Sequence, residues 1–516
     1  MSIPGGDSKK RARTLFALGA VALPLLITGI LYACCGKITN AETLFHTTFA
    51  EQGLRVIFSG ELPSVQLDFL QKSFSDQSLL FHFFLYLIQW LPVAGKVLLL
   101  LGIYFGSALF AAKSLHLRMR SFFAGSLLFL FAALPLFDSL TALTPDIFAV
   151  SALLLSFGIM GREMPGKQRL LWFFILAFLA PWSFPCPQIV LIPPLLTGLL
   201  RIRKGEILAP LLPLLTGSCA MFAGLLIHPH PLNTLKMWKL YNWNRIVDAL
   251  SVSYDPFLTD PALLSPSGKE ALFALPILLL VFIALTLRIR LREYRGHGAV
   301  HPSVTAAVIS AGFFSLAFFW VKSALLFAAP VAVLAFLSLG DTFLRGEQSL
   351  YKEQWKKIAW GFFAVSLLLT VLTATLYIKT VSPVPVPAKI GEYLAKNLPE
   401  GTPVLNGNRS DFSQLYAVAP HLRWQWGTDP VFATKKDKQK MALLIRAAHP
   451  EFSLVKRNGK VAFEADRISA QRLFSFYGTA YAVIAEPDQD ALNVMLQNGW
   501  QILHAVPGEG WILSVK

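Results

Sequence analysis

The sequence predicts a polytopic α-helical membrane protein with a small α/β domain at its C-terminal end. Hydrophobic residues make up 54% of the 516 residues and charged residues only 15%, a composition typical of integral membrane proteins. Apolar runs long enough to cross about 30 Å of hydrocarbon recur between residues 14 and 378. Beyond residue 378 the composition becomes that of an ordinary water-soluble domain.

The net charge of +16 does not indicate a nucleic-acid-binding protein, because the basic residues lie in short segments between alternate apolar runs. These segments are 9–13, 113–120, 162–169, 201–204, 288–295 and 345–357. Such alternation is the positive-inside pattern of multi-pass membrane proteins. It predicts a cytoplasmic N-terminus over residues 1–13, and we expect an integral protein of a bacterial inner membrane.

We expect about eleven membrane segments in a transmembrane domain of residues 14–378. Their expected bounds are 14–35, 94–112, 121–137, 146–161, 170–183, 187–200, 207–227, 272–287, 303–320, 324–340 and 358–378. An odd number of spans places the C-terminus outside the cell membrane. The five prolines between residues 181 and 194 predict that the fifth and sixth segments form a broken helical hairpin.

Two long connections, residues 36–93 and 228–271, fall on the outer side. The first has a helical pattern over 41–56, followed by the aromatic stretch "SLLFHFFLYLIQW", which is typical of a helix at the membrane interface. The second opens with "HPHP" at 228–231. Its two histidines suggest a metal site, but we favour a plain helix exit because the flanking prolines make an extended turn.

Residues 379–516 predict an extracytoplasmic α/β domain. A Pro-rich linker leads into an amphipathic helix and a short strand within "VPVPAKIGEYLAKNLPEGTPVLNGN". Near the end, "AYAVIAE" predicts a buried strand and "DQDALNVMLQNGW" a helix. The final "QILHAVPGEGWILSVK" predicts a hairpin that turns at residues 507–510.

Four short motifs occur in a characteristic order: "NAETLFHTTFAEQGL", "LLFHFFLYL", "LTPDIFAVSALLLSFGI" and "VKSALLFAAPVAVLAFLSL". With the C-terminal domain, this layout resembles the GT-C superfamily of integral membrane glycosyltransferases, in particular the protein O-mannosyltransferase and aminoarabinose transferase branch. The resemblance implies transfer of a sugar from a polyprenyl-phosphate donor to a lipid, glycan or protein acceptor on the outer face of the membrane.

The resemblance places Ala41 and Glu42 on the acidic pair of the first outer loop, so Glu42 alone keeps the charge. It places Asp146 on the acidic residue at the outer end of the fourth span, and Lys322 on the lysine of a late span. The chain departs from the pattern at Leu325, where the family has arginine.

Transfer from a lipid phosphate needs a carboxylate that deprotonates the acceptor or holds a divalent cation, and positive charge for the departing phosphate. We expect Glu42 and Asp146 to supply the carboxylates, with Mg or Mn as the cation they would hold. Lys322, Arg245 and His82 are the candidates for binding the donor phosphate. No other cofactor is expected.

Each candidate also has a simpler interpretation. Asp146 follows Thr144 and Pro145, which together predict an ordinary helix start with a hydroxyl cap and an acid in the first turn. Glu42 has the pattern of an exposed helix charge. Lys322 can extend its ammonium group to the membrane surface without any further role, and Asp138 fits a solvated loop.

Two other classes of function stay open. A lipid-linked sugar flippase or transporter predicts polar residues at mid-bilayer depth and an internal inverted repeat, and the sequence shows neither. A non-catalytic envelope-assembly protein would use the exposed C-terminal domain to bind a partner.

Overall fold

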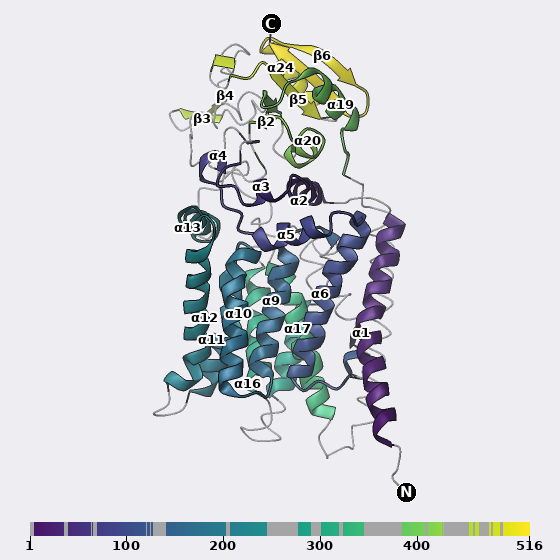
Figure 1. Cartoon of the computed structure of the whole chain (residues 1–516), viewed down its shortest axis with the longest axis vertical. Coiled ribbons are helices and arrows are strands. Elements are labelled where there is room, and N and C mark those ends of the chain that lie inside the picture. Colours follow the sequence, from purple (N-terminus) through teal and green to yellow (C-terminus); the bar gives the residue numbers. More distant parts are fainter. Residues whose placement is uncertain are drawn as a thin grey trace.

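The computed structural model has three layers: a bundle of upright helices, a layer of short helices on one end of it, and a β-sheet beyond that layer (Figure 1). The N-terminus lies at the free end of the bundle and the C-terminus in the sheet. The structure describes residues 5–35, 40–62, 64–65, 70–119, 121–123, 125–126, 141–202, 207–244, 277–289, 301–318, 324–344, 384–407, 411–425, 427, 454–457, 460–463, 474–475, 478–485 and 489–515.

Within these residues the bundle contains α1 (Gly5–Cys35), α6 (Val93–Ser114), α9 (Asp146–Gly161), α10 (Gly166–Ser183), η2 (Pro187–Leu191) with α11 (Ile192–Arg201), α12 (Leu208–Ile227), the helix Ile277–Ile289, α16 (Pro302–Ala317) and α17 (Ala324–Leu344). Four of the described helices, in α1, α6, α12 and α17, are long and apolar enough to cross a membrane. The apolar window of α17 is 78% buried and that of α1 only 17%, so α17 is central and α1 peripheral.

Glycine allows α10 and α12 to pack closely. A Cβ atom on Gly224 would lie 2.3 Å from the carbonyl oxygen of Phe178, and one on Gly217 would lie 2.2 Å from the ring of Phe173. In lipid, helices associate largely through such close packing, because the surrounding chains are as apolar as the side chains. These two glycines therefore fix how near the helices approach.

The layer on the bundle comes from the two long connections that the sequence predicts on the outer side, residues 36–93 and 228–271. It contains α2 (Ala41–Glu51), α3 (Leu54–Ile57), α4 (Leu70–Ser73), α5 (Leu79–Leu87), α13 (Pro231–Trp238) and η3 (Lys239–Asn244). Gly53 separates α2 from α3 with a φ of +88°, a left-handed conformation that glycine adopts without steric cost. The aromatic helix α5 lies across the end of the bundle (Figure 1).

The C-terminal segment forms a five-stranded sheet of order β2-β1-β5-β7-β6. Its elements are α19 (Ala388–Asn397), β1 (Pro403–Asn406), α20 (Phe412–Val418), β2 (Arg423–Trp424), β5 (Tyr481–Ala485), α24 (Gln489–Gln497), β6 (Trp500–Val506) and β7 (Gly510–Val515). Strand β1 runs parallel to β2 and β5, whereas β7 is antiparallel to β5 and β6. A separate hairpin joins β3 (Leu454–Arg457) and β4 (Lys460–Phe463).

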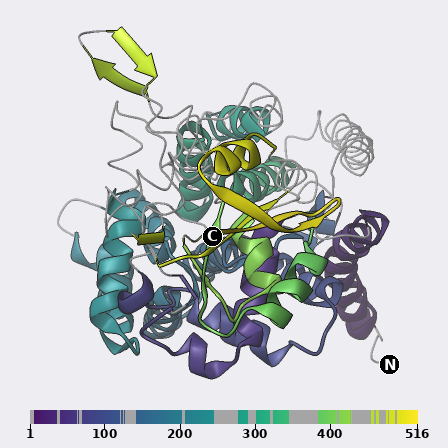
Figure 2. The ribbon, with the colours of Figure 1, turned by 90° about the horizontal axis from the view of Figure 1, so that it is seen from above.

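A second hydrophobic core joins this sheet to the layer below it. Phe49 of α2, Tyr416 of α20 and Trp424 of β2 are all buried in it. Val65, between α3 and α4, forms a parallel bridge with Trp424. The backbone amide of Trp424 donates a 2.9 Å hydrogen bond to the carbonyl of Ser64. The C-terminal sheet is therefore packed on the layer of short helices. Seen from above, the sheet overlies the helices (Figure 2).

The expected segments 94–112, 146–161, 207–227 and 324–340 fall on α6, α9, α12 and α17. The predicted broken hairpin is wrong for the fifth segment, because α10 continues through Pro181; the break falls in the sixth, where the 3₁₀ helix η2 precedes α11. Segment 358–378 and most of 121–137 lie outside the described residues. The count of about eleven spans and the domain bounds stay predictions.

Candidate active site

Glu42 stands in the first turn of α2, and its side chain is exposed. The side chain of Asn40 caps this helix by accepting a hydrogen bond of 2.8 Å from the amide of Glu42. Asparagine is a preferred N-cap because its oxygen satisfies an amide that has no partner within the helix. The cap fixes the backbone that carries the carboxylate at the surface of the outer layer.

Asp146 is the first residue of α9 and is half-buried. The expected hydroxyl cap from Thr144 is wrong: its hydroxyl is buried without a hydrogen-bond partner among the described residues. Pro145 itself takes the N-cap position with a helical backbone (φ −65°, ψ −12°), so Thr144 lies one residue too early. The acid in the first turn is as predicted, and it is favoured by the positive end of the helix dipole.

The helix that carries Glu42 contacts the segment just before α9. The amide of Leu143, just before Asp146, donates a buried hydrogen bond of 3.1 Å to the hydroxyl of Thr43, next to Glu42. The rings of Phe81 on α5 and Phe148 on α9 pack edge to face at 5.4 Å beside this junction. The first outer loop and the entrance of α9 therefore fold together. That their carboxylates line one cleft stays a prediction.

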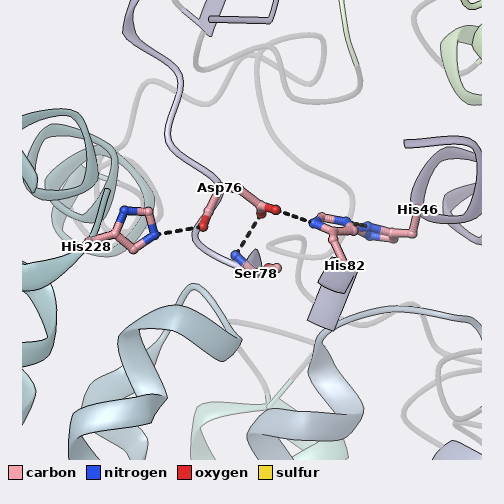
Figure 3. Close-up of polar contacts among 5 residues, drawn as sticks. All are labelled: His46, Asp76, Ser78, His82 and His228. Carbon is pink, nitrogen blue, oxygen red and sulfur yellow. Dashed lines mark hydrogen bonds and ion pairs between the residues drawn. The ribbon is translucent and has the colours of Figure 1, made fainter. Parts of the chain in front are cut away.

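A chain of three ionisable side chains lies in the same layer (Figure 3). Nδ1 of His82 lies 2.6 Å from Oδ2 of Asp76, and Nε2 of His82 lies 2.8 Å from Nδ1 of His46. Asp76 and His82 are each only 4% exposed, whereas His46 is half-buried. This set, which we call the Asp76–His82–His46 relay, leads from a buried carboxylate to a partly exposed imidazole.

The carboxylate decides which ring nitrogens carry protons. An ionised Asp76 can only accept, so Nδ1 of His82 must carry its proton and Nε2 of His82 becomes the acceptor. The proton between the two rings therefore belongs to Nδ1 of His46. Nε2 of a neutral His46 then keeps a free lone pair, and among the described residues this atom has no hydrogen-bond partner.

Aromatic rings surround the relay. Phe49 lies 4.7 Å from His82 and Phe81 lies 5.6 Å from His46, measured between ring centroids. Burial, and then the closeness of His82, lower the pKa of His46 well below its ordinary value, since both penalise a positive charge. The His46 ring is therefore neutral near pH 7 and can accept a proton.

The backbone around Asp76 is held from two directions. Its Oδ1 accepts a hydrogen bond of 2.9 Å from the amide of Ser78, and its carbonyl oxygen lies 3.1 Å from Nε2 of His228 (Figure 3). His228 lies 2.9 Å from the hydroxyl of Thr234 through its other nitrogen. Burial lowers the pKa of His228. The predicted helix exit at "HPHP" is confirmed, because α12 ends at Ile227 and His228 caps it.

The predicted phosphate-binding residues have different outcomes. His82 is buried with both ring nitrogens engaged in the relay, so contact with a phosphate would require it to give up one of these bonds; that role stays a prediction. Lys322, Arg245 and Asp138 lie outside the described residues. The sequence interpretation missed His46 and Asp76, although an acid and two histidines within aromatic, apolar stretches are an unusual pattern.

A divalent cation would need more than this layer provides. Among the residues that the structure describes, no three His, Cys, Asp or Glu side chains gather to hold a metal ion. Glu42 and Asp146 offer two carboxylates, which suffice for Mg only when waters and substrate phosphates complete its coordination. The protein alone does not build a metal centre in its described part.

The upright apolar helices define an integral membrane protein. Together with the layer on their end and the C-terminal sheet, they form the fold of the GT-C superfamily of glycosyltransferases. Oligosaccharyltransferase AglB from Archaeoglobus fulgidus, solved with an inhibitory peptide and a dolichol-phosphate, matches with a TM-score of 0.60 over 96% of this chain and 74% of that chain, at 10% identity. A complex of the Archaeoglobus fulgidus oligosaccharyltransferase with Zn and sulfate gives 0.54 over 95% and 73%, at 11% identity.

ArnT from Cupriavidus metallidurans bound to undecaprenyl phosphate matches over nearly its whole length. The TM-score is 0.51 over 96% of this chain and 97% of that chain, at 12% identity. At such identities the likeness shows the fold alone. No protein-family model and no curated protein matches the chain by sequence.

Proposed function

We propose that this chain is a membrane glycosyltransferase that moves a sugar from a polyprenyl-phosphate donor to an acceptor in the cell envelope. One observation carries the proposal: within a GT-C fold, the hydrogen bond from Leu143 to Thr43 joins the helix of Glu42 to the entrance of α9, where Asp146 lies. An enzyme fed from the bilayer needs its acids where a lipid headgroup meets water, and this end of the bundle is such a place.

The distribution of charge supports an orientation. The basic connections around Lys113, Arg162 and Arg201 follow α6, α9 and α11 at the bundle end that is far from the sheet. Under the positive-inside rule this end is cytoplasmic. The N-terminus would then be cytoplasmic, and the acids, the relay and the C-terminal domain extracytoplasmic, in a bacterial inner membrane.

The fold neighbours support the choice of donor. AglB was solved with a dolichol-phosphate and ArnT with undecaprenyl phosphate, and both are phosphorylated polyprenyl lipids. In this chain the departing phosphate would meet Lys322 and Arg245, and the sugar would lie against Glu42 and Asp146. A Mg or Mn ion, if held by these carboxylates and the donor phosphate, would supply positive charge for the leaving group.

The test is sugar transfer by the full chain in lipid vesicles, with undecaprenyl-phosphate sugars as donors. Replacing Glu42 by Gln or Asp146 by Asn keeps the shape of each side chain but removes its charge. We expect a fall in turnover of about 100-fold or more for each. Glu400→Gln is the matched control, because Glu400 is exposed in the C-terminal domain.

Other outcomes would favour the other classes. Unchanged turnover in both variants would remove these two carboxylates from the mechanism. Movement of an intact lipid-linked sugar across the vesicle membrane, without transfer, would favour a flippase or transporter. Binding of an envelope protein that depends on neither donor nor metal would favour an assembly role. Loss of transfer with EDTA would show that the cation is needed.

A further inference from the structure

The Asp76–His82–His46 relay does not belong to the pair of acids on which the proposed function rests. It ends on Nε2 of His46. Because Nδ1 of this ring donates to His82, which donates to Asp76, Nε2 of His46 keeps its lone pair. His46 is only half-buried, whereas the two groups behind it are sealed from solvent. A free base at the outer end of an otherwise buried polar chain is an arrangement that can take up a proton from a bound molecule.

The position of His46 relates it to the acids. Glu42 and His46 are four residues apart in α2, so their side chains lie on one face of the helix as neighbours. Thr43, which joins this helix to the entrance of α9, lies between them in the sequence. The imidazole therefore stands one helical turn from the carboxylate that the proposed function uses.

We propose that His46 is the general base of the transfer reaction, that His82 and Asp76 position it, and that the acceptor is consequently a hydroxyl group. This rests on the proposed function. Nε2 of His46 takes the proton of the acceptor hydroxyl as its oxygen forms the bond to C1 of the sugar. The bond from C1 to the donor phosphate breaks, and its electron pair stays on the phosphate oxygen.

The relay supplies what such a base needs after the proton has arrived. The new imidazolium of His46 keeps donating through Nδ1 to His82, which in turn donates to the carboxylate of Asp76. A buried negative charge at the far end offsets the positive charge that forms at the near end. His82 and Asp76 touch no substrate in this scheme and act through His46 alone.

The need for a base restricts the acceptor. A phosphate monoester is already ionised near neutral pH, because its second pKa is about 6, so it can attack without losing a proton. An alcohol keeps its proton at this pH and attacks poorly unless a base removes it during bond formation. A positioned imidazole is therefore useful for a glycan, lipid or side-chain hydroxyl and superfluous for a phosphate.

The experiment compares the full-length wild type with His46→Asn in vesicles. Asparagine keeps a donor near the position of Nδ1, so the bond to His82 can persist while the base is lost. Donors are undecaprenyl-phosphate sugars, and the acceptors are an alkyl glycoside, which offers hydroxyls, and a lipid phosphomonoester. The control His116→Asn makes the same change at the other end of the bundle, where the backbone φ of 61° suits asparagine.

The result expected is that kcat for the alkyl glycoside falls about 100-fold or more in His46→Asn, with KM and the thermal midpoint close to wild type. The decline of the wild-type rate at acidic pH should also disappear. Asp76→Asn should lower kcat as well, because an amide can donate and so removes the preference for the productive tautomer of His82.

Titratable groups on elements packed against α2 are His82 and Tyr86 on α5, Tyr416 on α20, Arg55 on α3, and Lys96 on α6 with its partner Glu51.

Three results would overturn the proposal. Transfer to the alkyl glycoside at the wild-type rate by His46→Asn would remove the base and leave the proposed function standing. If the wild type transfers sugar to the phosphomonoester but not to the alkyl glycoside, the proposal of a base also fails, because an ionised acceptor needs none. The proposed function would again stand. No transfer by wild type from any donor would overturn the proposed function together with this inference.

Discussion

Gln52, the C-cap of α2, donates a hydrogen bond of 2.7 Å to the hydroxyl of Tyr416 in α20, although 364 positions separate the two residues in the sequence. The bond ties the helix that carries Glu42 and His46 to the C-terminal segment. Burial raises the pKa of Tyr416, so its phenol stays neutral at physiological pH and keeps its hydrogen-bonding role. The C-terminal segment is thus part of the structure that holds the candidate site.

Tyr416→Phe should therefore destabilise the protein without disturbing the ring packing. Loss of the hydroxyl removes a hydrogen-bond partner from the Gln52 amide and from the Ser64 side chain, and each lost bond costs about 0.5–1.5 kcal/mol. The measurement is chemical unfolding of the detergent-solubilised protein. Tyr393→Phe is the control, because Tyr393 contacts its neighbour His504 by ring stacking. Equal stability of both variants would show that the hydrogen bonds of the Tyr416 hydroxyl contribute nothing.

Thr43→Val should weaken the junction between α2 and the entrance of α9. Valine has nearly the shape of threonine but cannot accept the hydrogen bond from Leu143, and a buried amide without a partner costs about 1–3 kcal/mol. We expect a lower thermal midpoint and slower sugar transfer. Thr48→Val, on the same helix, makes the same change at a half-buried position. If it matches Thr43→Val in both assays, the junction has no special importance.

Gly224→Ala should separate α10 from α12. The added Cβ would lie 2.3 Å from the carbonyl oxygen of Phe178, a backbone atom that cannot move without shifting the helix. Such overpacking costs about 1–3 kcal/mol, which thermal unfolding in detergent should detect. Gly102→Ala is the control, because nothing lies within 4 Å of the Cβ that it would add. A normal midpoint for the Gly224 variant would contradict this packing.

The stability of the protein should fall in mild acid. The pKa values of His46 and His228 are lowered by burial in the folded state, so the unfolded chain binds protons first. Both residues favour folding above the unfolded histidine pKa of about 6.5, and that contribution is lost as the pH falls from there towards the folded values. Thermal midpoints measured between pH 7.5 and 5 should decline, and less steeply in His46→Asn. A flat profile in wild type would contradict this sign.

Much of the fold could be predicted because hydrophobic pattern and local turn chemistry are properties of short segments. The apolar run at 146–161 and the final hairpin around residues 507–510 match α9 and the β6–β7 pair. The prediction failed where two local rules competed. Thr144 is a good capping residue in isolation, but Pro145 takes the cap position in the folded chain. The five prolines between residues 181 and 194 were expected to break both helices of a hairpin, but α10 continues through Pro181 to Ser183.

The candidate site was less accessible to prediction. Glu42 and Asp146 were identified through family resemblance, and their joint role stays a prediction. His46 and Asp76 were not identified, because their importance depends on which atoms meet after folding. Nδ1 of His46 meets Nε2 of His82, 36 residues further along the chain, and Nδ1 of His82 meets Oδ2 of Asp76. Spacing along a chain does not encode such a contact when the intervening loop has no regular period.

The sequence by itself determined that the chain lives in a membrane, where its apolar segments run, and which ends carry positive charge, because burial in lipid is a matter of local composition. Only the tertiary structure decided that Thr43 meets Leu143 and that a buried carboxylate orients His46. Hydrogen bonds act over about 3 Å, so they exist only after folding has brought distant segments together.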